Sequence, residues 1–62
     1  MKGWVTFTHH VSQEKLHIQI KNISGIREAQ KANLLLMKGT NGMYISESVD
    51  QIFELIRLGE EE

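Results

Sequence analysis

The 62-residue chain contains no cysteine and no proline, and only four of its residues are aromatic. The absence of cysteine excludes a disulfide framework, a thiolate metal site and a cysteine nucleophile. The longest unbroken apolar run, residues 34–37, is far shorter than the roughly 20 residues that a membrane-spanning helix needs. No apolar signal segment follows the N-terminus, so we expect a cytoplasmic protein without a membrane partner.

Positive and negative charges are divided unevenly along the chain. Residues 1–38 hold six cationic and two acidic side chains, a net charge of +4, whereas residues 39–62 hold one cationic and six acidic side chains, a net charge of −5. Such asymmetry is typical of a nucleic-acid-binding surface, but a basic sheet beside an acidic helix produces it too. Because no two cations are adjacent, the solvated sheet and helix are the simpler interpretation.

The first half of the chain has the composition of β-strands. Residues 4–8 are rich in β-branched and aromatic side chains, and residues 16–21 alternate apolar and polar side chains with period two. Residues 23–26 favour a short strand with a bulge or bend at Gly25, although a helix start is also compatible with them. Residues 28–33 fit either one helical turn or an irregular loop.

The second half predicts a hairpin followed by a helix. Residues 34–37 are continuously apolar, as in a strand that is covered on both faces. Asn41 and Gly42 predict a tight primed turn into a partner strand at 43–45. Ser48 and Gln51 match the capping box at a helix start. The apolar stripe of this helix consists of Val49, Ile52, Phe53, Leu55, Ile56 and Leu58.

Together these patterns predict one α+β domain over residues 1–59. We expect a small antiparallel sheet of four to five strands, with one C-terminal amphipathic helix packed on one face. Gly59 suits the position just past the helix end. The glutamates at 60–62 are expected to form a frayed acidic tail, because they oppose the helix dipole.

A domain of this size has too little chain to cover both faces of its sheet. One helix covers one face, so we expect the other to be covered by self-association in a dimer or small ring. A tightly curled small barrel, in which the sheet closes on itself, is the alternative. The residues expected to contact a partner or a second copy are Trp4, Phe7, Leu35, Met37, Leu55 and Leu58.

The sequence offers little for catalysis, for metal binding or for a cofactor. His9 and His10 point to opposite faces of a regular strand, so they do not ligate one metal together. His17 can meet one of them across the hairpin, but no third ligand has a suitable spacing. The serines lie in no nucleophile motif, and the acids lie on a solvated helix face. We therefore expect a protein that is not an enzyme and that has no cofactor.

Nucleic-acid contact is the alternative function that the composition leaves open. A basic sheet face with aromatic side chains has the chemistry that binds and stacks nucleotides. The residues expected to make this contact are Lys2, Lys15, Lys21 and Lys38.

Residues 16–56 also resemble a known kind of protein. The resemblance rests on the strand Leu16-His17-Ile18, on Ile23-Ser24-Gly25-Ile26-Arg27-Glu28, on Leu34-Leu35-Leu36 leading to Asn41-Gly42-Met43-Tyr44-Ile45, and on Glu47-Ser48-Val49-Asp50-Gln51-Ile52. This pattern is similar to the short flagellar FlbD and swarming-motility SwrD type of protein, and to small uncharacterised bacterial or phage proteins. The resemblance implies a non-enzymatic accessory protein, with a motility-related role as one setting, and it supplies no catalytic residues.

Overall fold

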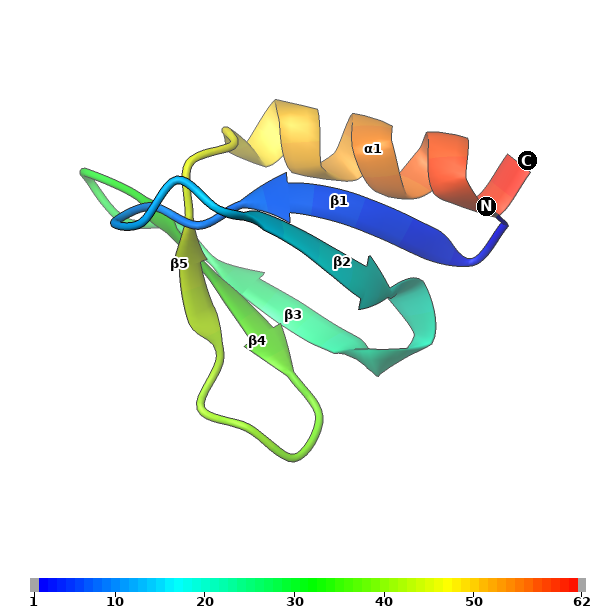
Figure 1. Ribbon diagram of the computed structural model, residues 1–62, viewed down its shortest axis with the longest axis horizontal. Helices are drawn as coiled ribbons and strands as arrows, with labels where there is room; N and C mark the ends of the chain where they lie inside the picture. Colours follow the sequence, from blue (N-terminus) through cyan, green and yellow to red (C-terminus); the bar gives the residue numbers. More distant parts are fainter. Residues whose placement is uncertain (1, 62) are drawn as a thin grey trace.

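The computed structural model describes residues 2–61, which form five strands and one C-terminal α-helix. The α+β class is therefore confirmed (Figure 1). In chain order the elements are β1 (Trp4–Thr8), β2 (Lys15–Gln19), the short 3₁₀-helix η1 (Ile20–Asn22), β3 (Ile23–Arg27), β4 (Asn33–Met37), β5 (Met43–Ile45) and α1 (Val49–Glu61).

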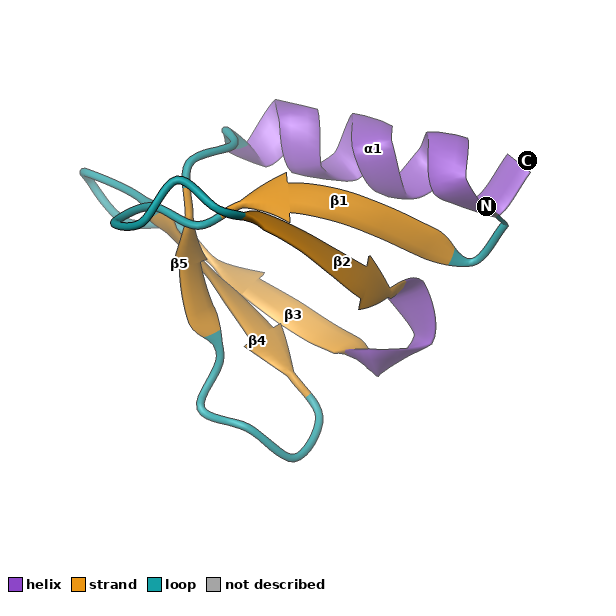
Figure 2. Ribbon diagram, viewed as in Figure 1, coloured by secondary structure: helices purple, strands orange, loops and turns teal. Residues whose placement is uncertain are grey.

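The strands are divided into two antiparallel sheets, where the sequence predicts one (Figure 2). Strands β1 and β2 form the first sheet, and β3, β4 and β5 form the second. The division arises at η1, because the strand expected over 16–21 ends at Gln19 and the chain turns before it enters β3. The sheets meet again where the His10 amide donates to the Tyr44 carbonyl and the Ser46 amide to the Thr8 carbonyl, both at 2.9 Å.

The core lies between the two sheets and the helix. Val5 and Phe7 point inward from β1 and pair with Ile18 and Leu16 of β2, so the strand predicted over residues 4–8 is confirmed. Full burial of one such side chain contributes about 2 kcal/mol to the free energy of unfolding. The buried apolar side chains are Val5, Phe7, Ile18, Leu35, Ile45 and Ile52.

The second sheet confirms some local predictions and corrects another. The bulge predicted in residues 23–26 is confirmed as a register shift between Ile23 and Gly25. Residues 28–32 form an irregular loop and not a helical turn. Strands β4 and β5 pair as expected, but five residues connect them, so the prediction of a two-residue primed turn is wrong.

The backbone conformation of Asn41 and Gly42 explains why this connection differs from a primed turn. The φ of Gly42 is 85°, as a glycine at a turn allows, but among residues 2–61 Gln13 is the one non-glycine residue with positive φ, so Asn41 does not adopt the required conformation. A Cβ on Gly42 would lie 2.5 Å from the Leu35 carbonyl oxygen. Gly42 therefore allows the loop to approach the backbone of β4 closely.

The start of helix α1 is the one predicted from the sequence. The Ser48 amide donates to Gln51 Oε1 at 2.9 Å, and the Gln51 amide donates to Ser48 Oγ at 3.2 Å. These two reciprocal bonds are the capping box, and they satisfy two backbone donors that have no partner within the helix.

The end of α1 differs from the prediction. The helix continues through Gly59 to Glu61, so the expected stop at Gly59 is wrong. The fraying of the acidic tail stays a prediction, and residue 62 lies outside the described residues. A Cβ on Gly59 would lie 2.6 Å from the Trp4 carbonyl oxygen, and the Gly3 amide donates to the Gly59 carbonyl at 2.9 Å. Gly59 is thus a point of close contact between α1 and β1. In Figure 1 the two elements lie side by side.

Within residues 2–61, α1 is too short and too polar to cross a lipid bilayer, and it is the longest helix.

Candidate functional site

The residues expected at a partner surface divide into exposed and buried groups. Trp4 and Leu58 remain 37% and 44% exposed. Met37 and Leu55 are half-buried. Phe7 and Leu35 are completely buried, so they belong to the core and are not available to a partner. The alternation of inward and outward side chains along β1 and β4 explains their burial.

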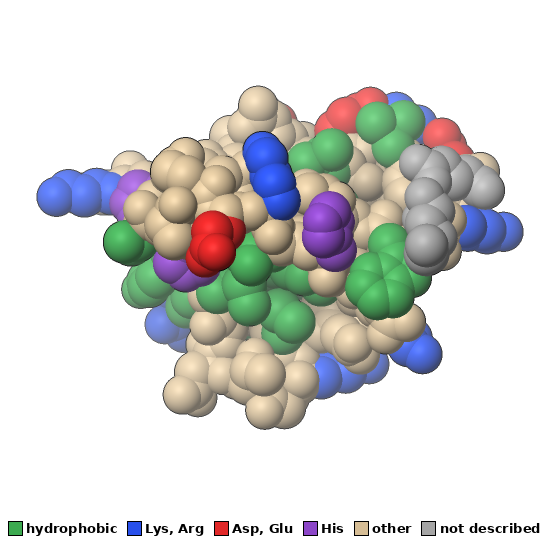
Figure 3. Space-filling model, viewed as in Figure 1, with side chains coloured by type: hydrophobic (Ala, Val, Ile, Leu, Met, Phe, Trp, Pro, Cys, Tyr) green, Lys and Arg blue, Asp and Glu red, His purple; other side chains and the backbone are tan. Residues whose placement is uncertain are grey.

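A groove lies between α1 and the outer side of the first sheet. Its floor and walls enclose about 520 Å³ and are mainly apolar. The lining residues are Trp4, Val5, Thr6, His17, Leu55, Leu58 and Gly59. In Figure 3, hydrophobic side chains lie over the end of α1 and the start of β1, with a histidine over β2 beside them.

This hollow borders a second one along the helix, which is also mainly apolar by area but is lined by acidic side chains. Leu55 lines both hollows, and the second is otherwise lined by Glu47, Asp50, Gln51 and Glu54. We call the two together the α1 groove. The α1 groove is therefore apolar at the C-terminal end of the helix and acidic at its N-terminal end.

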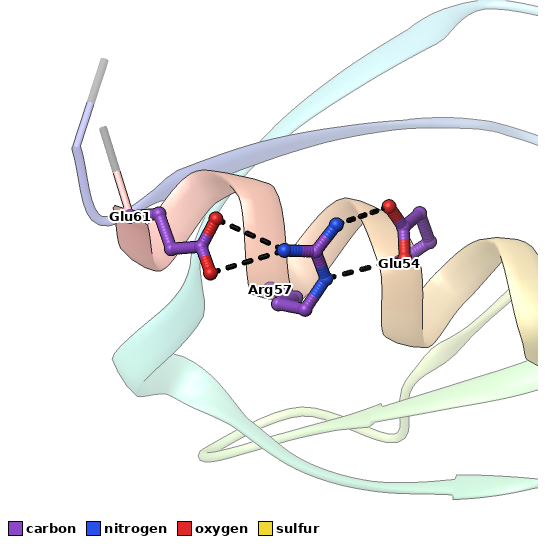
Figure 4. A network of polar contacts seen from close by, with 3 residues as sticks. All are labelled: Glu54, Arg57 and Glu61. Atoms are coloured by element: carbon purple, nitrogen blue, oxygen red, sulfur yellow. Dashed lines mark hydrogen bonds and ion pairs between the residues drawn. The ribbon is translucent and has the colours of Figure 1, made fainter.

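Arg57 pairs with two of the carboxylates on α1. Its guanidinium donates to the Glu54 carboxylate and, at 3.0 Å, to both carboxylate oxygens of Glu61 (Figure 4). The hydrogen bond from Arg57 lowers the pKa of Glu54, and the attraction between their charges adds to this effect. The same hydrogen bond raises the pKa of Arg57. Both groups are exposed, so salt screens their interaction.

Glu47 and Asn33 hold the segment that leads into the helix. The Thr8 amide donates to both Glu47 carboxylate oxygens, at 2.9 and 3.1 Å. The buried Asn33 donates through Nδ2 to the Glu47 carbonyl at 3.0 Å, and its Oδ1 accepts from the Ala29 amide at 3.4 Å. Sequence reasoning missed both roles, because Glu47 lies 39 residues from Thr8 and 14 from Asn33 and no local pattern marks such bonds.

The histidines make local contacts. His17 Nδ1 lies 2.9 Å from the Thr6 hydroxyl, its cross-strand neighbour. His9 Nδ1 accepts from the amides of Val11 and Ser12, both at 3.2 Å, and so stabilises the turn after β1. A nucleophilic Thr6 would need a base that a third group orients and donors for an oxyanion. Among the other residues that line this hollow, no side chain can orient His17 as a base, and the Trp4 indole N–H is the one side-chain donor.

Three of the four lysines expected at a nucleic acid lie on segments that meet at one end of the molecule. The Ile20 amide donates to the Gly3 carbonyl at 2.8 Å, and the Lys38 amide donates to the Asn22 carbonyl at 2.8 Å. These bonds bring together the segments that carry Lys2, Lys21 and Lys38. All three lysines are exposed. Lys15 lies at the start of β2, where its Nζ donates to the Thr8 hydroxyl at 3.0 Å.

No protein-family model, no curated protein and no solved structure matches this chain. The similarity of residues 16–56 to the FlbD and SwrD type of protein therefore stays a prediction.

Proposed function

We propose that this chain is a small accessory protein without enzymatic activity, which acts by self-association and by protein–protein contact. The α1 groove is the observation that carries the proposal. Its apolar end displays Trp4 and Leu58, two large side chains that line the same hollow and remain partly exposed. Tryptophan is among the residues that contribute most of the affinity at protein interfaces when a partner buries them.

The chemistry of the α1 groove selects the kind of partner. The apolar end favours a side chain such as leucine, and the acidic end, with Asp50 and Glu54, favours a lysine or arginine. We therefore propose that the occupant is an amphipathic protein segment that presents an apolar and a basic residue along one side. Such a segment lies along α1 and covers the exposed faces of Trp4 and Leu58.

The finer layout of the fold belongs to the same proposal. We propose that the five strands act as one curled sheet, and that α1 covers one face of it with its apolar stripe. The backbone hydrogen bonds between the end of β1 and β5 support the continuous sheet. The buried Ile52 and the contacts of α1 with β1 support the packing of the helix. A bacterial or phage origin, a cytoplasmic location and a motility-related setting stay predictions.

Peptide binding tests the proposal directly. Trp4 is the only tryptophan of the chain and lines the α1 groove, so its fluorescence reports on the occupant. A leucine–lysine amphipathic peptide without tryptophan is titrated into the protein. We expect a saturable blue shift of the emission, because the peptide excludes water from the Trp4 ring.

Two control peptides and one pair of variants sharpen this test. A leucine–glutamate peptide lacks the charge match and a lysine–serine peptide lacks the apolar anchors, so both are expected to bind at least tenfold more weakly, about 1.4 kcal/mol. Leu58→Glu is expected to abolish the shift. Phe53→Ser, which changes an exposed side chain outside the α1 groove, is expected to leave it intact. Equal binding of all three peptides, or no binding of the first, contradicts the proposal.

Nucleic-acid contact is a second candidate, supported by the meeting of the segments that carry Lys2, Lys21 and Lys38. Trp4 follows Gly3 at the same end of the molecule, so a stacking ring lies near these cations. Titration with a single-stranded oligonucleotide at low and at moderate salt tests this candidate. Affinity that falls with salt and is lost in Lys21→Glu supports it, and no binding at low salt contradicts it.

A further inference from the structure

The outer side of the second sheet carries a row of three side chains. Arg27 pairs with Leu34, and Leu34 pairs with Tyr44, so the three lie next to one another on one side of the sheet. Leu35, which follows Leu34, is fully buried, so the row points away from the core. Leu36 extends it along β4. We call the surface formed by Arg27, Leu34, Leu36 and Tyr44 the outer sheet face.

The outer sheet face is apolar and lies outside the core. Tyr44 is 50% exposed, Leu34 and Leu36 are half-buried, and none of the three packs against the buried core cluster. Leu36 leans over Gly25, since its Cδ1 lies 3.7 Å from the place of a Cβ on that glycine. Arg27 is the one charged residue of the face, and within residues 2–61 no carboxylate pairs with it. The face thus lacks the polar side chains that usually solvate the outside of a sheet.

We infer that the outer sheet face is where two copies of this chain pack together, sheet against sheet, about a two-fold axis parallel to β4. The inference rests on the self-association proposed above and names its surface. Sheets pack in this way at about 10 Å with their strands nearly aligned. The axis places Leu34 and Leu36 of one copy against the same residues of the second copy.

The two-fold axis also pairs the remaining two side chains of the row. Strands β3 and β5 flank β4 on opposite sides, so the axis places β3 of one copy over β5 of the other. Arg27 of each copy then meets Tyr44 of the other, and a guanidinium over an aromatic ring is a favourable cation–π contact. Within one copy the backbones of the two residues are separated by two strand spacings, about 9.6 Å, with Leu34 between them.

The second copy is the occupant that this arrangement favours. In an interface about a two-fold axis, both copies use the same surface, which must be complementary to itself. If a first residue of one copy contacts a second residue of the other, the reverse contact also forms. The row Arg27–Leu34–Tyr44 meets this condition, because it holds a cation and its aromatic partner at equal distances from a central apolar residue. A different protein would have to supply an apolar strip and both partners by itself.

Sedimentation equilibrium of the wild type and of two single variants tests the inference. We expect the wild type to reach twice its 7.1 kDa mass as its concentration rises. Arg27→Glu places a carboxylate over the Tyr44 ring, and Tyr44→Lys places two cations together, so each is expected to weaken the dimer at least tenfold, about 1.4 kcal/mol. An equimolar mixture of the two variants is expected to restore it. One heterodimer then holds an unchanged Arg27–Tyr44 contact on one side of the axis and, on the other, the introduced carboxylate against the introduced ammonium.

The outcomes of this experiment support or contradict a dimer through the outer sheet face. Both variants must keep the circular dichroism spectrum of the folded chain and, at concentrations where the wild type is monomeric, its melting temperature. Phe53→Ser serves as an exposed apolar control that leaves the dimer unchanged. A wild-type dimer that both variants still form, or that the mixture fails to restore, overturns the outer sheet face and leaves the proposed self-association standing. A wild type that sediments at 7.1 kDa at every concentration overturns both, while peptide binding in the α1 groove is decided separately.

Discussion

The two sheets have similar apolar inner faces, but the side chains on their outer faces differ. Inside, Phe7 of the first sheet and Leu35 of the second are both fully buried and belong to one core. Outside, the first sheet displays the hydrogen-bonded pair Thr6 and His17. The second displays Leu34 and Tyr44 at paired positions, so its outer side pairs apolar side chains where the first pairs polar ones and keeps Trp4 beside them.

The position of the helix matches this difference in chemistry. Helix α1 packs against β1 and η1, and the groove beside it gives the first sheet a concave, mixed surface. The second sheet makes few contacts with the helix and keeps a plain pleated surface. We therefore expect the first sheet to recognise an amphipathic segment and the second to recognise another sheet, and four substitutions probe how far the two regions differ.

The largest effect is expected in the core that both sheets share. Phe7→Ala removes a completely buried ring and is expected to lower the free energy of unfolding by about 3–5 kcal/mol. A 62-residue chain has a total stability of roughly 3–9 kcal/mol, so much of this variant is expected to be unfolded. Phe53→Ala, at a ring that is 60% exposed, is the matched control and is expected to change stability by less than about 0.5 kcal/mol. Chemical denaturation of both variants measures the difference.

The connection between β4 and β5 provides the next test, which is confined to the second sheet. Gly39 and Gly42 both have positive φ, but a Cβ on Gly39 meets no atom within 4 Å, whereas one on Gly42 would lie 2.5 Å from the Leu35 carbonyl oxygen. Each Gly→Ala variant is expected to lose about 1–2 kcal/mol from backbone strain. Gly42→Ala is expected to lose about 1–3 kcal/mol more from overpacking. Equal denaturation midpoints for the two variants would show that the loop moves aside without difficulty.

The helix cap tests the element that distinguishes the first sheet. Ser48→Ala removes the hydroxyl that accepts from the Gln51 amide and is expected to lower stability by about 1 kcal/mol. Ser46→Ala keeps the backbone bond from the Ser46 amide to the Thr8 carbonyl, so its effect is expected to stay within about 0.5 kcal/mol. Thermal melting compares the two. A larger loss at Ser46 contradicts the assignment of the helix start to Ser48.

The smallest effect is expected at the exposed ion pair of α1. Because Arg57 lowers the pKa of Glu54 below its ordinary value of 4.5, the pair stabilises the folded chain above that pH and loses its contribution as the pH falls through the lowered pKa. The wild type should therefore melt slightly above Glu54→Gln at neutral pH, and the difference should vanish in strong acid and in high salt. A difference that persists in strong acid would contradict an origin in charge.

Several parts of the fold were predictable because they depend on neighbours in the sequence. The reciprocal bonds of Ser48 and Gln51 join residues three apart, and the strand β1 follows from the β-branched and aromatic composition of residues 4–8. The positive φ of Gly42 follows from its place in a turn. The exposed members of the candidate site, Trp4 and Leu58, were also identified from the sequence, but the acidic half of the α1 groove was seen only as a solvated helix face.

Other parts were not predictable because they depend on residues that are distant in the chain. Pattern alone does not tell an inward apolar side chain from one that faces a partner, so Phe7 and Leu35 were expected at a contact surface and lie in the core. The hydrogen bond from the Thr8 amide to the Glu47 carboxylate joins the end of β1 to the segment that leads into α1. Gly59 has the composition of a helix stop, and it instead lies inside the helix where the Trp4 carbonyl leaves no room for a side chain.

Hydrophobic period, capping chemistry and turn residues dictate the strands, the helix start and the class of this fold, since each acts within a few residues. Three features arise only when distant segments pack. They are the split into two sheets at η1, the extension of α1 to Glu61 and the different side chains on the two outer faces. Packing decides them because burial and close backbone approach are properties of the whole folded chain and not of any short stretch within it.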